Sequence, residues 1–442
     1  ARLCVYNPGY DFKKKKLKRV LIISYYWPPS GGPGVQRWLK FVKYLPEYNI
    51  EPILFVPKNA NYPLIDNSLA DQVDTDLKVI SHPITEISKF LPKFEFLKSA
   101  RAGNISIPAN QSFFQKVFFF IRGNLFIPDM KIFWKNSSVN FLSDYISKNN
   151  IDAIITTGPP HSVHLIGLEL KRKLDVKWIS DFRDPWVNLN YLNRFHLLSS
   201  SKKSHKSLRN KVLVNSDAVI VTSEKLKNLF LNITTNVFKI TNGFDYINKE
   251  INLDKKFSIS HVGSLYPERN PKFLWDVLEE LFDGSLFSDL QINFIGNTSE
   301  KIKKELSKRK FEKSIKFYDY VDYNKATELM CSSQVLLMVE VNDEQSSYAI
   351  PGKLFDYLNS KRPIISIGPT DSEVAQILNN TASGKFFNYD EVHSLKSHIK
   401  KLYERFKNGS NNSNTNQSIE KYNRKNLTRE LSEIIGLVTR KS

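Results

Sequence analysis

Short apolar runs alternate along this chain with segments whose apolar residues recur at helical spacing. Residues 20–25 form the first run, residues 35–45 carry the first helical pattern, and residues 52–56 form the next run. A continuous apolar run is typical of a strand that is buried on both faces of a parallel sheet. This order predicts a βαβ unit, which is normally right-handed.

The same alternation continues in two blocks, which predicts two parallel α/β domains. In the first block, strands are expected at 152–156, 177–180 and 218–222, and a helix at 162–174. In the second block, strands are expected at 257–262, 290–295, 315–318, 335–340 and 363–367, and helices at 271–283, 299–310, 323–332, 352–359 and 371–379. The predicted fold class is α/β, with two Rossmann-like, doubly wound parallel-sheet domains. Their ligand-binding loops, at the carboxyl ends of the strands, are expected to face a cleft.

The expected boundaries follow changes in this pattern. The N-terminal domain spans 18–241, the polar segment 242–256 serves as the hinge, and the C-terminal domain spans 257–407. The asparagine-rich segment 408–418 is expected to be a mobile loop, and 419–438 a helix that packs back on the N-terminal domain.

Between about residues 84 and 134, prolines and clustered phenylalanines interrupt the alternation. One interpretation is an inserted amphipathic region that lies on a membrane surface. The other is a helix that packs on the sheet through its aromatic face. The best candidate for a membrane span, Phe113 to Ile127, has 15 residues and contains four polar ones, so it is too short to cross a bilayer.

The composition indicates a folded protein of more than one domain. The 442 residues suffice for two or three domains, and 41% hydrophobic with 25% charged residues excludes disorder over most of the length. Cys4 and Cys331 lie far apart and outside any Cys/His cluster, which argues against a disulfide framework or a zinc site. This use of cysteine makes the reducing cytoplasm the expected location. Residues 1–12 lack the pattern of a secretory signal.

The 64 Lys and Arg residues exceed the 45 Asp and Glu residues by 19, which favours an anionic partner. Nucleic acid, an acidic membrane leaflet and a phosphorylated substrate all meet this condition. No nucleic-acid-binding module is recognisable, so nucleic acid is not the expected partner. Basic residues of the first half suit peripheral binding to the inner face of a plasma membrane, or a solvated surface: Lys13 to Lys16, Lys202, Lys203, Lys206, Arg209 and Lys211.

A glycine-rich turn follows the first predicted strand. Gly31, Gly32 and Gly34 precede a predicted helix, and Arg37 lies in its first turn. Glycines let backbone amides approach a ligand, and the amino end of a helix favours negative charge. The spacing matches neither a dinucleotide-binding nor a P-loop motif. The turn is therefore a candidate substrate-binding loop, or a tight connection that binds nothing.

Four segments in this order resemble the retaining glycosyltransferases of family 4, which have the GT-B fold. They are GGPGVQR at 31–37, NGFD at 242–245, GSLYPERNP at 263–271 and IPGKLFDYLNSKRPII at 350–365. The likeness covers about residues 18–405. Bacterial members that build surface polysaccharide and carry a YYWPPSGG loop and a DFRDPW segment are particularly similar.

The resemblance implies transfer of a sugar, with retention, from a nucleotide diphosphate sugar to a lipid-linked or saccharide acceptor. The leaving diphosphate is expected to take the acceptor proton. The four motifs contain no DxD metal pair, so neither a metal nor another cofactor is expected. The alternatives are an inactive scaffold of this fold, an inverting enzyme, and a basic nucleic-acid-binding protein.

In the family, two basic residues after the first strand of the second domain hold the diphosphate. Here Ser264 follows Gly263 at the first basic position, which departs from the family, and Arg269 stands at the second. The resemblance makes Arg269 the diphosphate ligand, since a guanidinium offers a fork of donors to phosphate oxygens. The alternative is a surface ion pair with Glu268 or Glu300.

The segment Pro351-Gly352-Lys353 opens a predicted helix, whose amides and lysine are expected to bind phosphate. Asp356 falls where the family has the glutamate that bonds the ribose hydroxyls. The other glutamate of that motif is replaced by Tyr348, with Glu344 as a candidate substitute.

His161 ends the TTGPPH segment, where related enzymes carry a catalytic or sugar-binding histidine. The alternative is a histidine that only caps the following helix. The hinge motif adds Asn242 and Gly243 as substrate-binding candidates.

The DFRDPW segment carries Asp181, Arg183 and Asp184 at the end of a predicted strand. Asp181 is a candidate acceptor base or orienting group, and Arg183 and Asp184 are candidate substrate contacts. The alternative is a buried Asp–Arg pair that stiffens this loop.

Overall fold

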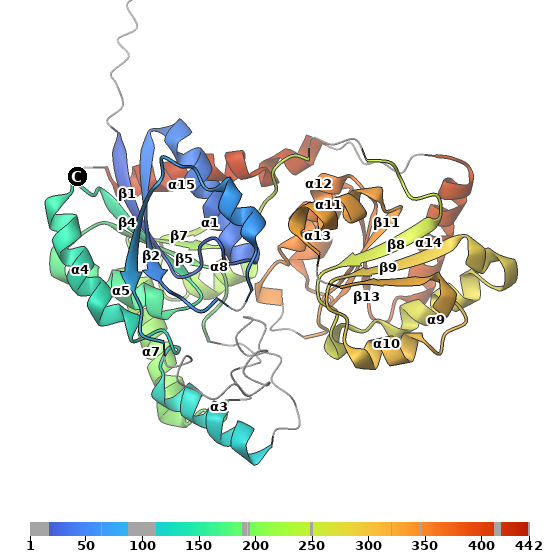
Figure 1. Ribbon diagram of the computed structural model, residues 1–442, viewed down its shortest axis with the longest axis horizontal. Coiled ribbons are helices and arrows are strands. Elements are labelled where there is room, and N and C mark those ends of the chain that lie inside the picture. Colours follow the sequence, from blue (N-terminus) through green and yellow to red (C-terminus); the bar gives the residue numbers. More distant parts are fainter. Residues whose placement is uncertain are drawn as a thin grey trace, which may run out of the picture.

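The computed structural model describes residues 17–62, 64–86, 112–187, 192, 195–247, 251–319, 321–343, 347–410 and 417–440. Lys13 to Lys16, residues 87–111 of the inserted region, Glu344 and residues 411–416 of the asparagine-rich segment lie outside these ranges. Two α/β lobes lie side by side, with α3 extending away from the first of them (Figure 1).

The N-terminal lobe is built on a parallel sheet in the order β3-β2-β1-β4-β5-β6-β7. Its strands are β1 (Lys18–Ser24), β2 (Ile50–Lys58), β3 (Lys78–Pro83), β4 (Ala153–Gly158), β5 (Trp178–Phe182), β6 (Ala218–Val221) and β7 (Val237–Lys239). The chain order reverses between β1 and β4, so the loops after these two strands run to opposite faces. Doubly wound sheets bind ligands at such a point.

Helices cover both faces of this sheet. They are α1 (Pro33–Tyr44), α4 (Trp134–Lys148), α5 (Ser162–Leu174), α7 (Ser199–Asn215) and α8 (Glu224–Leu231), while α3 (Phe113–Leu125) extends the lobe. Leu21 and Ile23 pack with residues of α4, α5, α7 and α8, whereas Val20 and Ile22 pack with residues of α1. Because both faces of β1 are covered, its sequence is a continuous apolar run.

The C-terminal lobe has a second parallel sheet, in the order β10-β9-β8-β11-β12-β13. Its strands are β8 (Phe257–Val262), β9 (Leu290–Ile295), β10 (Ile315–Tyr318), β11 (Val335–Val339), β12 (Ile364–Gly368) and β13 (Gly384–Asn388). Its helices are α9 (Lys272–Leu281), α10 (Glu300–Leu306), α11 (Tyr323–Ser332), α12 (Lys353–Ser360), α13 (Glu373–Thr381) and α14 (Val392–Lys407). The order reverses between β8 and β11, and the two sheets confirm the predicted fold class.

The last helix, α15 (Arg424–Val438), belongs to the core of the first lobe. Leu431 and Ile435 pack in one cluster with Val20 and Ile22 of β1. The preceding 3-10 helix, η8 (Gln417–Tyr422), places Tyr422 in the core of the second lobe. The chain therefore crosses back from the second lobe to the first, and Figure 1 shows α15 along the first lobe.

Candidate functional site

The loops that carry the predicted residues lie at the carboxyl ends of the central strands, where parallel sheets bind ligands. Contacts from the start of α8 join the two lobes beside these loops. Ser223 Oγ donates a hydrogen bond to the Tyr348 carbonyl oxygen (2.6 Å), and the backbone N–H of Lys225 donates to Glu373 Oε1 (2.8 Å). Lys225 Nζ also donates to Ser347 Oγ (2.9 Å). The loop before α12 is thereby held against the first lobe.

The glycine-rich turn makes room for Arg183. A Cβ atom at Gly34 would lie 1.5 Å from Arg183 Nη1, so only glycine lets the guanidinium occupy this place. Arg183 Nε donates to the Gly158 carbonyl (3.0 Å), and Nη2 donates to the Pro159 carbonyl (2.7 Å). Arg183 therefore links the turn after β1 to the loop after β4.

The other glycines of this turn have different roles. Gly32 has a φ of 108°, a conformation that favours glycine, and it precedes the first residue of α1. A Cβ atom at Gly31 would lie 2.9 Å from Leu64 Cδ2, so Gly31 packs closely against that side chain. The geometry of the turn thus depends on all three predicted glycines.

Asp181 is fully buried and accepts hydrogen bonds from three side chains. The donors are Arg37 Nη2 (2.9 Å), Trp38 Nε1 (2.8 Å) and Thr157 Oγ1 (2.9 Å). Arg37 is only 4% exposed and also donates through Nη1 to the Thr241 carbonyl (2.7 Å). The pair ties α1 to β4, β5 and Thr241, the residue before the hinge.

This geometry favours the alternative for two candidate residues. Asp181 presents no exposed oxygen to an acceptor, and the guanidinium of Arg37 is already bonded to protein groups. Both residues therefore fit the alternative, a buried Asp–Arg pair, although the arginine is Arg37 and lies far away in the sequence. We assign them a positioning role.

His161, at the end of the loop after β4, forms a bonded pair with Asp184, on the loop after β5. His161 Nε2 and Asp184 Oδ1 are 2.7 Å apart, and the same oxygen accepts from the Trp186 backbone N–H (3.0 Å). The imidazole stacks on the Trp186 ring with centroids 4.7 Å apart. Burial would raise the pKa of the Asp184 carboxyl, but the charge and hydrogen bond of His161 hold this pKa below its usual value.

His161 is oriented by these contacts rather than by a cap on its own helix, since its side chain caps no backbone N–H of α5. His161 Nδ1 is buried and has no hydrogen-bond partner among the described residues. His164, one turn further on, bonds Thr156 Oγ1 through Nδ1 (2.9 Å), and burial keeps its pKa well below the usual value. His164 is thus a packed core histidine.

The second lobe brings Lys353 to the loop after β8. Lys353 Nζ donates to the Val262 carbonyl (3.2 Å) and lies 3.3 Å from His261 Nε2. Gly263 has a φ of 106°, and a Cβ atom there would lie 3.8 Å from Lys353 Nζ. Burial and, to a smaller extent, the charge of Arg269 lower the pKa of Lys353 to about 7, although Glu340 opposes the shift.

Arg269 ends the 3-10 helix η4 (Pro267–Arg269) on the same loop and is half-buried. Lys353 Nζ reaches the Val262 carbonyl at the end of β8, and Arg269 lies on the loop that follows, so both basic groups belong to the same edge of the sheet. The expected alternative, an ion pair with Glu268 or Glu300, does not occur in the described part of the chain; Glu300 pairs with Lys303 instead (3.0 Å).

Glu340 was missed by sequence reasoning. It directly follows β11, is 5% exposed, and accepts a hydrogen bond from Ser372 Oγ (2.6 Å). Burial raises the pKa of Glu340 to about 7, although this hydrogen bond and the charges of Arg269 and Lys353 oppose the shift. A carboxylate at the end of a predicted buried strand was the signal that would have found it.

The other predicted residues of the second lobe lie around the amino end of α12. Pro351 and Gly352 precede the helix and are half-buried, as is Ser264 beside Gly263. Asp356, in the first turn of α12, accepts a hydrogen bond from the Tyr323 hydroxyl (3.2 Å), and burial raises its pKa.

The hinge glycine has a packing role. A Cβ atom at Gly243 would lie 2.3 Å from the Tyr422 carbonyl oxygen and 2.5 Å from Leu427 Cδ1. Gly243 therefore lets the hinge pass against the returning C-terminal segment, which explains this position without a substrate. Asn242 Oδ1 is buried and has no hydrogen-bond partner among the described residues.

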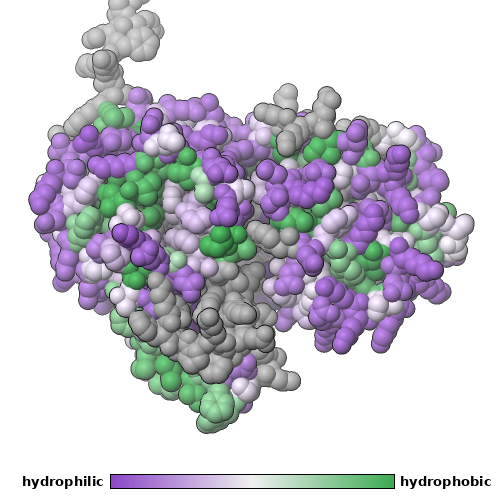
Figure 2. All heavy atoms as spheres, viewed as in Figure 1, coloured by the Kyte–Doolittle hydropathy of each residue, from purple (hydrophilic) through white to green (hydrophobic). Residues whose placement is uncertain are grey.

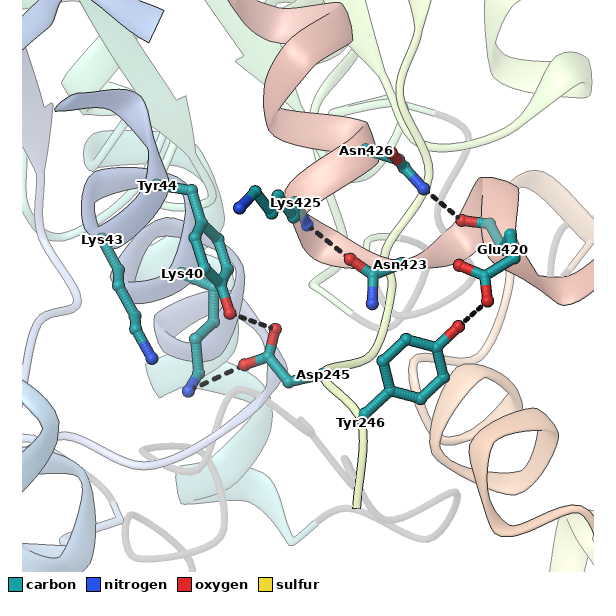
Figure 3. Close-up of a pocket in the computed structure, with 9 residues that line it drawn as sticks. All are labelled: Lys40, Lys43, Tyr44, Asp245, Tyr246, Glu420, Asn423, Lys425 and Asn426. Atoms are coloured by element: carbon teal, nitrogen blue, oxygen red, sulfur yellow. Dashed lines mark hydrogen bonds and ion pairs between the residues drawn. The ribbon is translucent and has the colours of Figure 1, made fainter. Parts of the chain in front are cut away.

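A cavity of about 730 Å³ lies at the hinge, and its lining includes none of the predicted site residues (Figure 3). In it, Asp245 bonds Lys40 Nζ (2.9 Å) and the Tyr44 hydroxyl (3.1 Å), and Tyr246 bonds Glu420. Its lining residues come from α1, the hinge and the C-terminal segment: Lys40, Lys43, Tyr44, Asp245, Tyr246, Glu420, Asn423, Lys425 and Asn426. The charges that line the cavity are largely paired, so we do not assign the donor to it.

Neither the known protein-family models nor the curated proteins match this chain. Several solved structures are similar to it along nearly the whole chain. HepE of Anabaena, solved in complex with UDP-glucose, gives a TM-score of 0.60 at 11% identity, over 95% of this chain and 99% of that chain. A glycosyltransferase from Rickettsia africae gives 0.61 at 12% identity, over 97% and 100%. A sucrose-phosphate synthase from Thermosynechococcus elongatus gives 0.60 at 11% identity, over 95% and 98%.

At these identities the likeness establishes the fold. The chain has the GT-B fold, in which two Rossmann-like domains are paired, as predicted.

Proposed function

We propose that this protein is a retaining glycosyltransferase of the family 4 type. It would transfer a hexosyl group from a nucleotide diphosphate sugar to a lipid-linked or saccharide acceptor during synthesis of a cell-surface polysaccharide. The observation that carries the proposal is that the basic side chain of Lys353 reaches the end of β8, on whose following loop Arg269 lies, at the carboxyl edge of the second sheet. Two such groups on one loop edge complement the charge of a diphosphate.

In the proposed reaction, the donor diphosphate lies against Arg269, Lys353 and the backbone amides at the amino end of α12. The bond between the anomeric carbon and the diphosphate oxygen breaks while the acceptor oxygen attacks from the same face. The leaving diphosphate takes the acceptor proton, so no protein nucleophile is required. The cations stabilise the negative charge that develops on the leaving oxygen.

The first lobe supplies the orienting groups of the proposed site. Asp184 and Trp186 fix the ring of His161, and its buried, unpartnered Nδ1 is the atom that we assign to the donor sugar or the acceptor hydroxyl. Arg183 holds the two carbonyls just before His161. We place the acceptor at the inner face of an anionic membrane, where the basic residues of the first lobe would face it.

A screen of nucleotide sugars tests the function directly. We expect one of the UDP-, GDP- or ADP-linked sugars to stabilise the protein by about 2.7 kcal/mol at 100 times its Kd, measured by thermal shift. Turnover with that donor, followed by NMR of the product, is expected to show the donor's anomeric configuration. Binding without turnover would identify the inactive scaffold that Ser264 and Tyr348 suggest, and no stabilisation by any donor would contradict the proposal.

The affinity for the donor is expected to fall as the pH rises. Lys353 and Glu340 both have a pKa of about 7, so raising the pH removes a positive charge and adds a negative one beside the diphosphate. UDP-glucose is a suitable probe because its diphosphate does not titrate here. We expect binding about tenfold weaker at pH 8 than at pH 6, measured by calorimetry.

Variants separate the two groups. Lys353→Met is expected to bind weakly at every pH, and Glu340→Gln is expected to keep the part of the pH dependence that belongs to the lysine. A wild-type affinity that does not change between these pH values would contradict the assignment of Lys353 to the diphosphate.

A further inference from the structure

Helix α3 carries an apolar face that is exposed in the described part of the chain. Six of its side chains are between 40% and 81% exposed: Phe113, Phe114, Val117, Phe120, Ile121 and Leu125. At about 3.6 residues per turn they form one stripe along the helix, which we call the α3 face. Figure 2 shows these apolar side chains gathered at the end of the first lobe, where Figure 1 places α3.

The opposite side of α3 is packed, so the exposure does not come from a detached helix. Phe119 is 1% exposed and stacks on Phe195, with ring centroids 5.7 Å apart. A Cβ atom at Gly123 would lie 2.5 Å from Leu197 Cδ2 on the same side. Near the C-terminal end of the helix, Asn124 Oδ1 accepts from the Leu198 backbone N–H (2.8 Å). The α3 face is therefore held outward by a fixed contact with the segment that begins α7.

The charge around the α3 face has one sign. Residues 112–128 and 195–215 contain no Asp or Glu. Lys116 on α3 and Lys202, Lys203 and Lys206 on α7 are exposed, and none of them forms an ion pair within the described ranges. An apolar stripe with basic residues beside it suits an anionic lipid surface better than a second copy of the same basic face.

We propose that the α3 face inserts into the interface of an anionic phospholipid bilayer, while the lysines of α3 and α7 contact the lipid headgroups. The helix lies on the membrane and does not cross it, since no helix in the described part of the chain is long and apolar enough to span one. Membrane binding by the α3 face does not depend on the proposed function. Only its role, which is to bring the site to a lipid-linked acceptor, rests on that function.

The experiment measures co-sedimentation of the full chain with phosphatidylcholine vesicles, with and without phosphatidylglycerol, in the absence of any nucleotide sugar. We expect preferential binding to the anionic vesicles, and we expect the double variant Phe113→Ser/Phe114→Ser to bind at least about tenfold more weakly. The matched control Leu286→Ser/Leu437→Ser removes two exposed leucines elsewhere (37% and 50% exposed) and is expected to bind like the wild type.

Lys202→Gln/Lys203→Gln is expected to reduce binding to anionic vesicles only. Unchanged thermal unfolding and donor binding of the phenylalanine variant would show that it is folded, and would separate this proposal from the proposed function. Equal binding of the wild type to neutral and anionic vesicles, or wild-type binding by the phenylalanine variant, would overturn the proposal. A dimer that the phenylalanine variant converts to a monomer, with vesicle binding unchanged, would also overturn it.

Discussion

Replacing Arg269 with alanine is expected to lower kcat by about 100- to 1,000-fold, which corresponds to about 2.7–4 kcal/mol of lost transition-state stabilisation. The guanidinium forms no ion pair within the described ranges, and it acts electrostatically on Lys353, which is also basic, and on Glu340, a carboxyl whose pKa burial raises to about 7. Its charge is therefore available to the diphosphate. The loss should fall mainly on kcat, because the negative charge develops as the sugar leaves.

The matched control is Arg405→Ala, which removes an exposed arginine from the last turn of α14 in the same lobe. It is expected to leave kcat and KM unchanged. Arg269→Ala should also unfold like the wild type, since it breaks no contact of the core. A decrease in kcat smaller than about tenfold, near 1.4 kcal/mol, would show that Arg269 does not hold the diphosphate.

The central strands of both lobes were predictable because a strand that is buried on both faces has a continuous run of apolar residues. The strands at 257–262 and 290–295 have the predicted bounds. The pattern failed at β3, where no residue is buried, and at β7, which has only three residues. Edge strands of this kind carry too few apolar positions to be distinguished from loops.

The amphipathic helix α14 was missed although its signal was present. Leu395, Ile399 and Leu402 recur at helical spacing and are buried. Helix α7 is different, because lysines and serines dominate its sequence and its buried residues include His205 and Arg209. The sequence of such a helix has too few apolar residues at helical spacing for the helix to be predicted from them.

Part of the candidate site could be predicted from the sequence, and part could not. The order of strands and loops places His161, Arg269 and Lys353 at the carboxyl edges of the two sheets, and that follows from the parallel topology alone. The Arg37–Asp181 pair joins residues that are 144 positions apart, so no local pattern distinguishes it from a substrate-binding arginine and a catalytic carboxylate. Only the fold shows that these two groups bind each other.

Replacing Gly34 with alanine is expected to lower kcat/KM by about 100-fold, because the new methyl group would displace the Arg183 guanidinium. Arg183 would then lose its hydrogen bonds to the Gly158 and Pro159 carbonyls, and the loop that carries His161 would shift. The guanidinium is the flexible end of a long side chain, so the free energy of unfolding should fall by only about 1–3 kcal/mol. Activity assays and denaturant unfolding measure the two effects.

A double-mutant cycle with Arg183→Ala distinguishes this mechanism from general damage to the turn. If Gly34→Ala acts by displacing Arg183, the double variant should be no less active than Arg183→Ala alone, since the group that clashes is gone. Gly436→Ala is the matched control: its Cβ atom would come no closer than 3.9 Å to Lys18 Nζ, and alanine favours the helix α15. It should leave activity unchanged and raise stability. If the losses of activity add in the double variant, Gly34 is required for the approach of the backbone to a ligand, and not for the position of the Arg183 guanidinium.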